Sequence, residues 1–166
     1  MVILGIDPGL AIVGWGVIDY SGSKFTTLGY GSIETPAHTD TESRLLLIYQ
    51  GLSQIINKYR PEQMAVEELF FNTNITTGIR VAEARGVILM CAHQLGVKIF
   101  EYTPLQVKQA VVGYGRAEKK QVITMVTALL GLAKPPKPDD TAVALAIAVC
   151  HAHSGTSRLA QYYNQK

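Results

Sequence analysis

The 166-residue sequence predicts one α/β domain built on a mixed five-stranded sheet flanked by helices. Two observations lead to this class. Three apolar segments joined by short turns open the chain, as in an antiparallel meander, and helical and strand-like segments then alternate, as in crossover units. The length suits a single core, and an apolar content of 48% argues against intrinsic disorder.

The first strand is expected at Val2–Asp7, because an almost continuous apolar run is typical of a central strand covered on both faces. Pro8 and Gly9 then turn the chain, and residues 21–23 supply a second turn. The remaining strands are expected at residues 11–19, 25–33, 63–66 and 97–102.

Helices are expected between and after these strands. The segment Thr41–Tyr59 carries apolar residues at helical spacing, and Arg60-Pro61 ends it. A last helix begins at Asp139 or Asp140, one of which is expected to cap it, and runs to about residue 153. The other helices are expected at residues 76–95 with Gly96 as C-cap, in a short piece opened by Thr103-Pro104, and at residues 118–130.

Domain organisation follows from this pattern. Residues 1–153 are expected to form the folded domain, and residues 154–166 a polar tail that frays. The chain shows no secretory signal and no apolar run of the roughly 20 residues that a membrane span needs. Cys91 and Cys150 lie in apolar helical patterns without metal-site spacing, so structural thiols in a cytoplasmic protein are expected.

Charge is distributed unevenly although the net charge is only +2. Residues 1–78 hold 4 Lys and Arg against 8 Asp and Glu, whereas residues 79–137 hold 9 against 3. Such a division can place an acidic site beside a cationic surface, as a polyanionic substrate handled through metal ions requires. Charge alone favours solvated helix faces equally well.

Three carboxylates stand at the ends of expected elements. Asp7 closes the first strand, Glu67 and Glu68 follow the fourth, and Asp140 begins the last helix. Adjacent strand residues point to opposite faces, so only one of the two glutamates can join Asp7. A cluster of three acids suits a hard cation such as Mg²⁺, and two such ions serve phosphodiester hydrolysis. Ordinary roles as a turn residue, surface acids and a helix cap remain open for each.

Several segments resemble the RuvC family in order and spacing: GIDPGLAIVGWGVID, AVEELFFNTN, EARGVI, VKQAVVGYGRAEKKQV and ALAIAVCHAH. The resemblance covers nearly the whole chain. It implies an RNase H-like homodimer that binds four-way DNA junctions and makes paired, symmetric, ligatable nicks. It also implies Mg²⁺ as cofactor, two ions in each active site with Mn²⁺ as an alternative, and a branch-migration helicase complex as partner.

By the same resemblance, Asp7, Glu67 and Asp140 match the catalytic, metal-binding carboxylates of the family. The family usually carries a fourth acid one helical turn after the third, where this chain has Val143. Valine can neither bind Mg²⁺ nor orient a water, so impaired cleavage is expected. The alternative is partial compensation by Asp139 or His151, of which His151 lies about two turns beyond Val143.

Candidate DNA-binding residues also follow from the resemblance. Phe70 resembles the family phenylalanine that stacks on bases opened at the junction centre, and stacking tolerates any base. Lys108 and Lys119 match family lysines near the scissile strand, where they would hold phosphates and offset transition-state charge. Further candidate phosphate contacts are Arg116, Lys120, Arg80 and Arg85. Ordinary surface roles compete for all of these cations.

Two other functions stay open at this point. The opening strand–turn–strand also resembles the phosphate loop of actin-like and sugar kinases, although 166 residues cannot hold two such lobes. A junction-binding module without nuclease activity is the second alternative. Binding and cutting are separable, because phosphate and stacking contacts do not need the metal site.

Overall fold

The computed structural model describes residues 1–69 and 75–155. The predicted mixed sheet is present, with its five strands in the order β3-β2-β1-β4-β5. The strands are β1 (Val2–Asp7), β2 (Ile12–Ser21), β3 (Lys24–Glu34), β4 (Gln63–Glu67) and β5 (Lys98–Tyr102). β1, β2 and β3 pair antiparallel, whereas β4 lies parallel to β1 and β5 parallel to β4.

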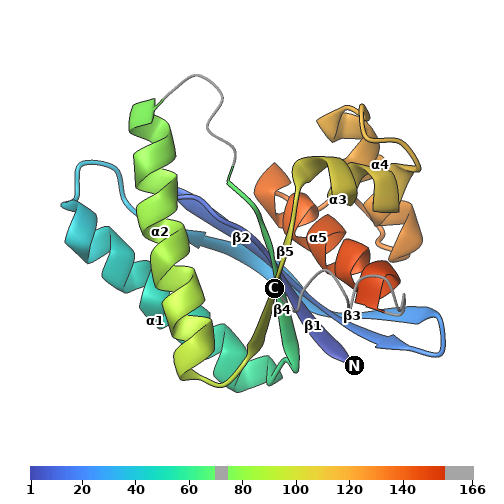
Figure 1. The fold of residues 1–166 in the computed structure, drawn as a ribbon, viewed down its shortest axis with the longest axis horizontal. Coiled ribbons are helices and arrows are strands. Elements are labelled where there is room, and N and C mark those ends of the chain that lie inside the picture. The colour runs from blue at the N-terminus through green and yellow to red at the C-terminus, as the bar shows by residue number, and fades with distance from the viewer. Residues whose placement is uncertain (70–74, 156–166) are drawn as a thin grey trace.

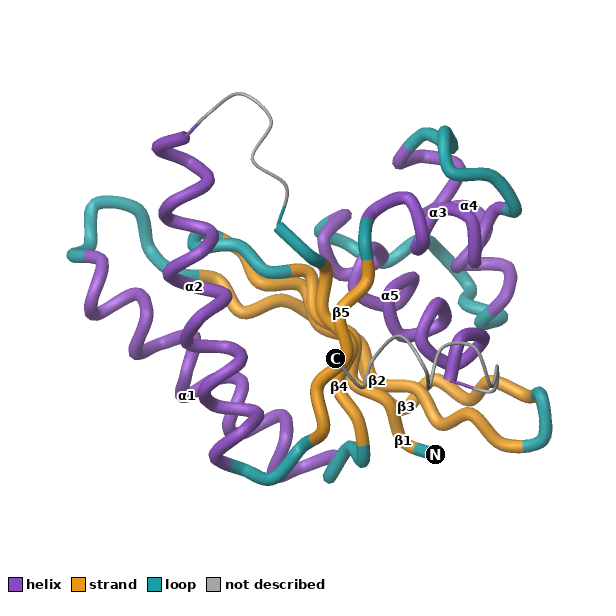
Figure 2. The backbone as a smooth tube through the Cα atoms, viewed as in Figure 1, coloured by secondary structure: helices purple, strands orange, loops and turns teal. Residues whose placement is uncertain are grey.

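Helices cover both faces of the sheet (Figures 1 and 2). One face carries α1 (Thr41–Tyr59) and α2 (Ile75–Gln94). The other carries α3 (Pro104–Val112), α4 (Lys119–Leu129) and α5 (Asp139–Gly155). The prediction of a sheet flanked by helices is therefore confirmed, with element ends shifted by one or two residues.

Two hydrophobic cores result, one on each side of the sheet. Alternate residues of β1 divide between them: Ile3 packs toward α5, and Leu4 and Ile6 pack toward α1 and α2. Both cysteines are free and buried, one in each core.

α5 lies unusually close to the sheet because glycines face it. A Cβ on Gly14 would come within 2.1 Å of the Asp140 carbonyl oxygen, and one on Gly5 within 2.0 Å of the Ala144 carbonyl oxygen. A Cβ on Gly16 would similarly meet the Leu145 side chain at 2.5 Å. This close packing fixes where the first turn of α5 lies relative to the end of β1.

The expected cap of α5 is wrong in detail. The helix begins at Asp139, so both aspartates lie within its first turn, and the Thr141 N–H donates to the Pro138 carbonyl. Asp139 accepts a hydrogen bond from Lys137 at 2.7 Å instead of bonding the helix backbone. Asp140 is consequently available to face a neighbouring element.

No helix within the described ranges is long and apolar enough to cross a membrane. The last helix continues to Gly155, two residues beyond the predicted end of the domain. The rest of the predicted tail, and the predicted site residue Phe70, lie outside the described residues.

Candidate active site

The three predicted carboxylates line one pocket of about 380 Å³. The pocket lies where β1 and β4 end, between the sheet and the helices α3, α4 and α5. Its wall is formed by Asp7, Glu67, Pro104, Val107, Lys108, Lys119, Val122, Asp140 and Val143. Segments from four distant parts of the chain therefore meet at the carboxyl ends of two parallel strands, where α/β folds place their sites.

Strand alternation decides which glutamate joins the pocket. Ile6 pairs with Val66, and one residue further Asp7 and Glu67 both turn toward the α5 face of the sheet. Glu68 does not line the pocket, and its backbone N–H donates to the Tyr102 carbonyl at 2.8 Å. The prediction that only one glutamate can join Asp7 is borne out by this geometry.

The carboxylates repel one another in a partly dry environment. Burial, together with the negative charges of Glu67 and Asp140, raises the pKa of Asp7 to about 8, although the charge of Lys119 opposes this rise. Burial also raises the pKa of Glu67, although Lys108 and Lys119 oppose this change. A site that disfavours its own negative charge is one that a bound cation would stabilise.

Two lysines supply the positive charge on one side of the pocket. Lys119 Nζ lies 4.0 Å from Asp140 Oδ1, and Lys108 lines the same wall from α3. Both are lysines singled out from the sequence. Lys120 and Arg116 are exposed on the neighbouring surface and do not line the pocket.

Arg85 holds the end of β4 in place. Its guanidinium forms an ion pair with Glu101 at 2.6 Å, and its Nε donates to the Glu67 carbonyl at 3.3 Å. The side chain is only 15% exposed. These contacts indicate that Arg85 positions Glu67, whereas the sequence led us to expect a phosphate contact. No spacing rule links residues 85 and 101, so the sequence could not reveal this ion pair.

Neither residue considered as a replacement for the missing acid reaches the pocket. Asp139 is engaged by Lys137 on the exposed side of the helix. His151 is buried among Tyr102, Phe100 and Gln63 at the beginning of β4, the opposite end of that strand from Glu67. Val143 itself lines the pocket, so an apolar side chain stands beside the three carboxylates.

The family model for the crossover junction endodeoxyribonuclease RuvC matches residues 3–151 of this chain. The chain belongs to the RuvC family. The RuvC of Clostridioides difficile (strain 630) is 59% identical over 155 residues, which cover 93% of this chain and 91% of that protein.

Solved RuvC structures agree with the fold described above. The Thermus thermophilus RuvC structure matches with a TM-score of 0.86 and 37% identity, covering 93% of this chain and 95% of that one. The same RuvC in complex with a Holliday junction substrate matches with a TM-score of 0.86 and 38% identity, covering 92% and 93%. These matches confirm the RNase H-like class that the resemblance implied, and the kinase alternative loses its support.

Proposed function

We propose that this RuvC family chain recognises four-way DNA junctions and that its carboxylate pocket is the site of paired phosphodiester cleavage in recombination and repair. The observation that carries the proposal is the pocket that joins Asp7, Glu67 and Asp140 to Lys108 and Lys119. Membership of a family of crossover junction endonucleases and the likeness to a junction-bound RuvC support the substrate.

The donor set of the pocket fits hard divalent cations. Within the described ranges no three potential ligands are gathered tightly enough to form a finished metal site. Asp7, Glu67 and Asp140 nevertheless line one pocket, where burial and the charges of the other two carboxylates raise the pKa of Asp7. We infer that they hold Mg²⁺, two ions in each site, with Mn²⁺ as an alternative. Such ions activate water and stabilise the leaving oxygen.

The protein side chains would position the substrate. Lys108 and Lys119 can each bind non-bridging oxygens of the scissile phosphate, since their ammonium groups line the wall that faces the carboxylates. Their charge would also offset the negative charge that grows on the phosphorus oxygens during attack. Arg85 would maintain this geometry indirectly, by fixing the end of the strand that carries Glu67.

Val143 makes slow or absent cleavage part of the proposal. Three carboxylates provide one negative charge fewer than the four of the family pattern, against two divalent cations. The structure offers no substitute among the residues considered, because Asp139 and His151 are both engaged elsewhere. Junction binding without efficient cutting is therefore the specific form of the function proposed for this chain.

A homodimer suits a substrate with two equivalent strands. α2 carries the exposed apolar side chains Ile79 and Met90, which favours the predicted helix around residues 81–91 as part of the interface. Phe70 as a base-stacking residue, cytoplasmic location and a branch-migration helicase partner belong to the same proposal through the family resemblance.

Binding specificity tests this proposal independently of cleavage. A gel shift without divalent cations would compare a synthetic four-way junction with a linear duplex made from the same arm sequences. We expect clearly tighter binding to the junction, because the dimer would contact two strands that a linear duplex does not present together. Equal affinity for the two DNAs would contradict junction recognition.

A further inference from the structure

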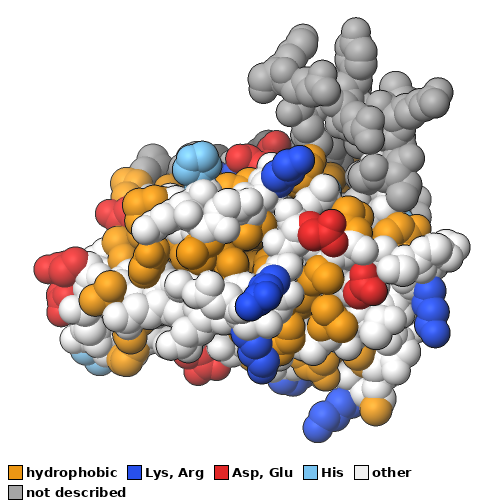
Figure 3. All heavy atoms as spheres, turned by 90° about the horizontal axis from the view of Figure 1, so that it is seen from below, with side chains coloured by type: hydrophobic (Ala, Val, Ile, Leu, Met, Phe, Trp, Pro, Cys, Tyr) orange, Lys and Arg blue, Asp and Glu red, His pale blue; other side chains and the backbone are white. Residues whose placement is uncertain are grey.

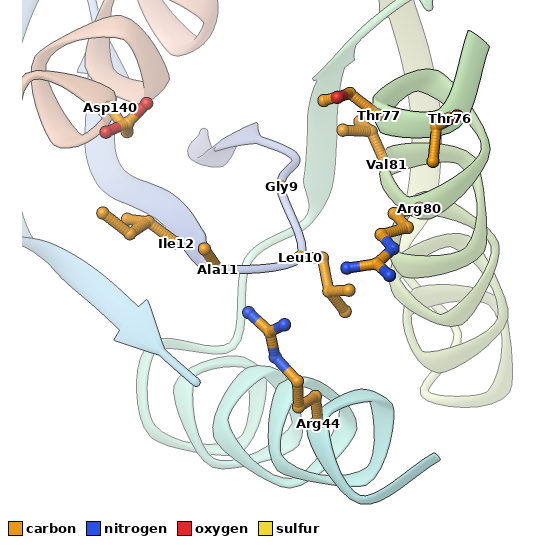
Figure 4. Close-up of a pocket in the computed structure, with 10 residues that line it drawn as sticks. All are labelled: Gly9, Leu10, Ala11, Ile12, Arg44, Thr76, Thr77, Arg80, Val81 and Asp140. Carbon is orange, nitrogen blue, oxygen red and sulfur yellow. The ribbon is translucent and has the colours of Figure 1, made fainter. Parts of the chain in front are cut away.

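A second pocket is lined by Gly9, Leu10, Ala11 and Ile12, which follow β1, and by residues of α1 and α2 (Figure 4). Its volume is about 610 Å³, and Asp140 borders both pockets. Arg44 enters it from α1 and Arg80 from α2, and both guanidinium groups point toward the loop around Leu10. Cations from two separate helices thus converge in a pocket that shares Asp140 with the carboxylate pocket.

Arg44 is held in this position by a buried threonine. The Arg44 Nε donates to Thr35 Oγ1 at 2.8 Å, and the Thr35 hydroxyl donates onward to the Leu10 carbonyl at 2.6 Å. Thr35 is only 7% exposed, and its own N–H donates to the Ala11 carbonyl. The contacts of Arg44 with described residues use Nε alone, so the two terminal nitrogens remain for a ligand.

The two arginines of this pocket form no ion pair within the described part of the protein. Asp140 is the one acid among the lining residues, and it lies across the loop from both arginines (Figure 4). Planar guanidinium groups that converge without a partner suit a phosphate, which they can bind through two parallel hydrogen bonds.

We propose that this pocket, the Arg44–Arg80 pocket, binds a backbone phosphate of the DNA strand beyond the scissile phosphate. The inference rests on the proposed function, because the shared Asp140 makes the two pockets neighbours along one path. A strand gripped by Lys108 and Lys119 on one side of the carboxylates would continue into the arginines on the other. Thr35 acts as a positioning residue, since it touches the DNA only through Arg44.

Salt dependence of junction binding tests the two arginines. We expect Arg44→Ala and Arg80→Ala each to weaken binding about tenfold at moderate salt. Each should also reduce the slope of the logarithm of the binding constant against the logarithm of the salt concentration by about 1, as expected for one lost phosphate contact. Lys24→Ala removes one charge from the exposed β2–β3 hairpin and should change neither quantity comparably. Arg44→Lys should restore much of the slope, which a folding defect would not allow.

A double-mutant cycle tests the positioning role of Thr35. Thr35→Val should weaken junction binding when Arg44 is present, and Thr35→Ser, which keeps the hydroxyl, should restore it. In an Arg44→Ala background, Thr35→Val should have little further effect on binding. A full additional loss in that background would show that Thr35 acts on the fold and would overturn the positioning claim.

The outcomes separate this pocket from the function on which it depends. If the unmodified chain prefers the junction but the arginine variants bind it as Lys24→Ala does, only the proposed phosphate site in the Arg44–Arg80 pocket is overturned. Failure of the unmodified chain to prefer a junction would overturn the proposed function, and this inference with it. Equal loss of linear-duplex binding would still support a phosphate contact, because such contacts carry no sequence or branch information.

Discussion

Val143 is the residue on which the proposed separation of junction recognition from cleavage depends. It stands one helical turn after Asp140 and lines the same pocket as Asp7 and Glu67, so a carboxylate there would point at the same cations. An isopropyl group offers no ligand and would leave bound divalent cations less neutralised. The change leaves Lys108 and Lys119, the proposed phosphate contacts, in place, which is why we expect binding to survive.

Asp140 and Asp139 provide a matched pair for testing the carboxylate assignment. In a Val143→Asp background, Asp140→Asn should lower the junction cleavage rate by at least about 100-fold, because even outer-shell partners of metal ligands are worth about 10–100-fold. Asp139→Asn removes the same charge from the adjacent exposed position, which pairs with Lys137, and should leave the rate nearly unchanged. Equal losses from both would show that local charge, not ligation, is what matters.

His151 should make the free energy of unfolding depend on pH. Its Nδ1 shares a hydrogen bond with the Tyr102 hydroxyl at 2.7 Å, its Nε2 bonds Gln63, and burial lowers its pKa from the usual 6.5 to about 4. Below pH 6.5 the unfolded chain binds a proton that the native state refuses. Stability should therefore fall with decreasing pH toward 4, by a contribution approaching about 1.4 kcal/mol per pH unit.

The measurement is a comparison of denaturant unfolding between this chain and His151→Gln from pH 7 to pH 4.5. Only the difference between the two proteins reports on His151, because Asp7, with its raised pKa, acts in the opposite direction throughout this range. We expect His151→Gln to be less stable at pH 7 but to lose less stability on acidification. Parallel pH profiles would rule out a neutral buried imidazole.

At the scale of the elements, the packing of α5 against β1 and β2 builds the site. Gly5, Gly14 and Gly16 lie under this helix, and any Cβ on them would meet its backbone or side chains. Asp140 can approach Asp7 only because Gly14, which pairs with Asp7 across β1 and β2, leaves that space open. The site therefore depends on the lack of side chains at these three glycines, which lets α5 approach the sheet.

Gly14→Ala should damage both stability and the site. Its Cβ would come within 2.1 Å of the Asp140 carbonyl oxygen, a backbone atom that cannot move without the helix. We expect a loss of about 1–3 kcal/mol in the free energy of unfolding, as for other overpacked cores, and a lower cleavage rate in the Val143→Asp background.

The control for this variant is Gly86→Ala in α2, where no described atom of the same chain lies within 4 Å of the new Cβ. Because Gly86 lies in the helix proposed for the dimer interface, both variants are compared at the same protein concentration. Alanine is the better helix former by about 1 kcal/mol, so this variant should be as stable or more so. Unfolding at the same denaturant concentration for both variants would contradict the account of α5 packing.

The sequence predicted the helices and strands well, but it did not predict several of the side-chain contacts between them. The apolar run of β1 and the helical spacing of α1 have local causes, so both elements were predicted with their observed bounds. Alternation along β4 predicted that only one of Glu67 and Glu68 could join Asp7; the family resemblance indicated Glu67, which is the one that lines the pocket. The Arg85–Glu101 pair and the Arg44–Thr35 contact follow no periodicity, because tertiary packing alone brings these side chains together. Glycine spacing in β2 was the available, unused signal for the close approach of α5.

For the whole molecule, the charged groups of the site gather at one end. The carboxylates, the two lysines and the Arg44–Arg80 pocket all lie near the carboxyl ends of β1 and β4, at the upper end of the sheet in Figure 1. The opposite end, seen in Figure 3, mixes Lys and Arg with Asp and Glu among apolar side chains.

The most direct test of the central claim is the cleavage of a labelled four-way junction in Mg²⁺ by this chain and by Val143→Asp, with binding of both measured in parallel without divalent cations. The account predicts equal binding, and cleavage that is absent or at least about tenfold slower until the aspartate is introduced. Equal cleavage rates for the two proteins would contradict it, because three carboxylates would then suffice for the reaction.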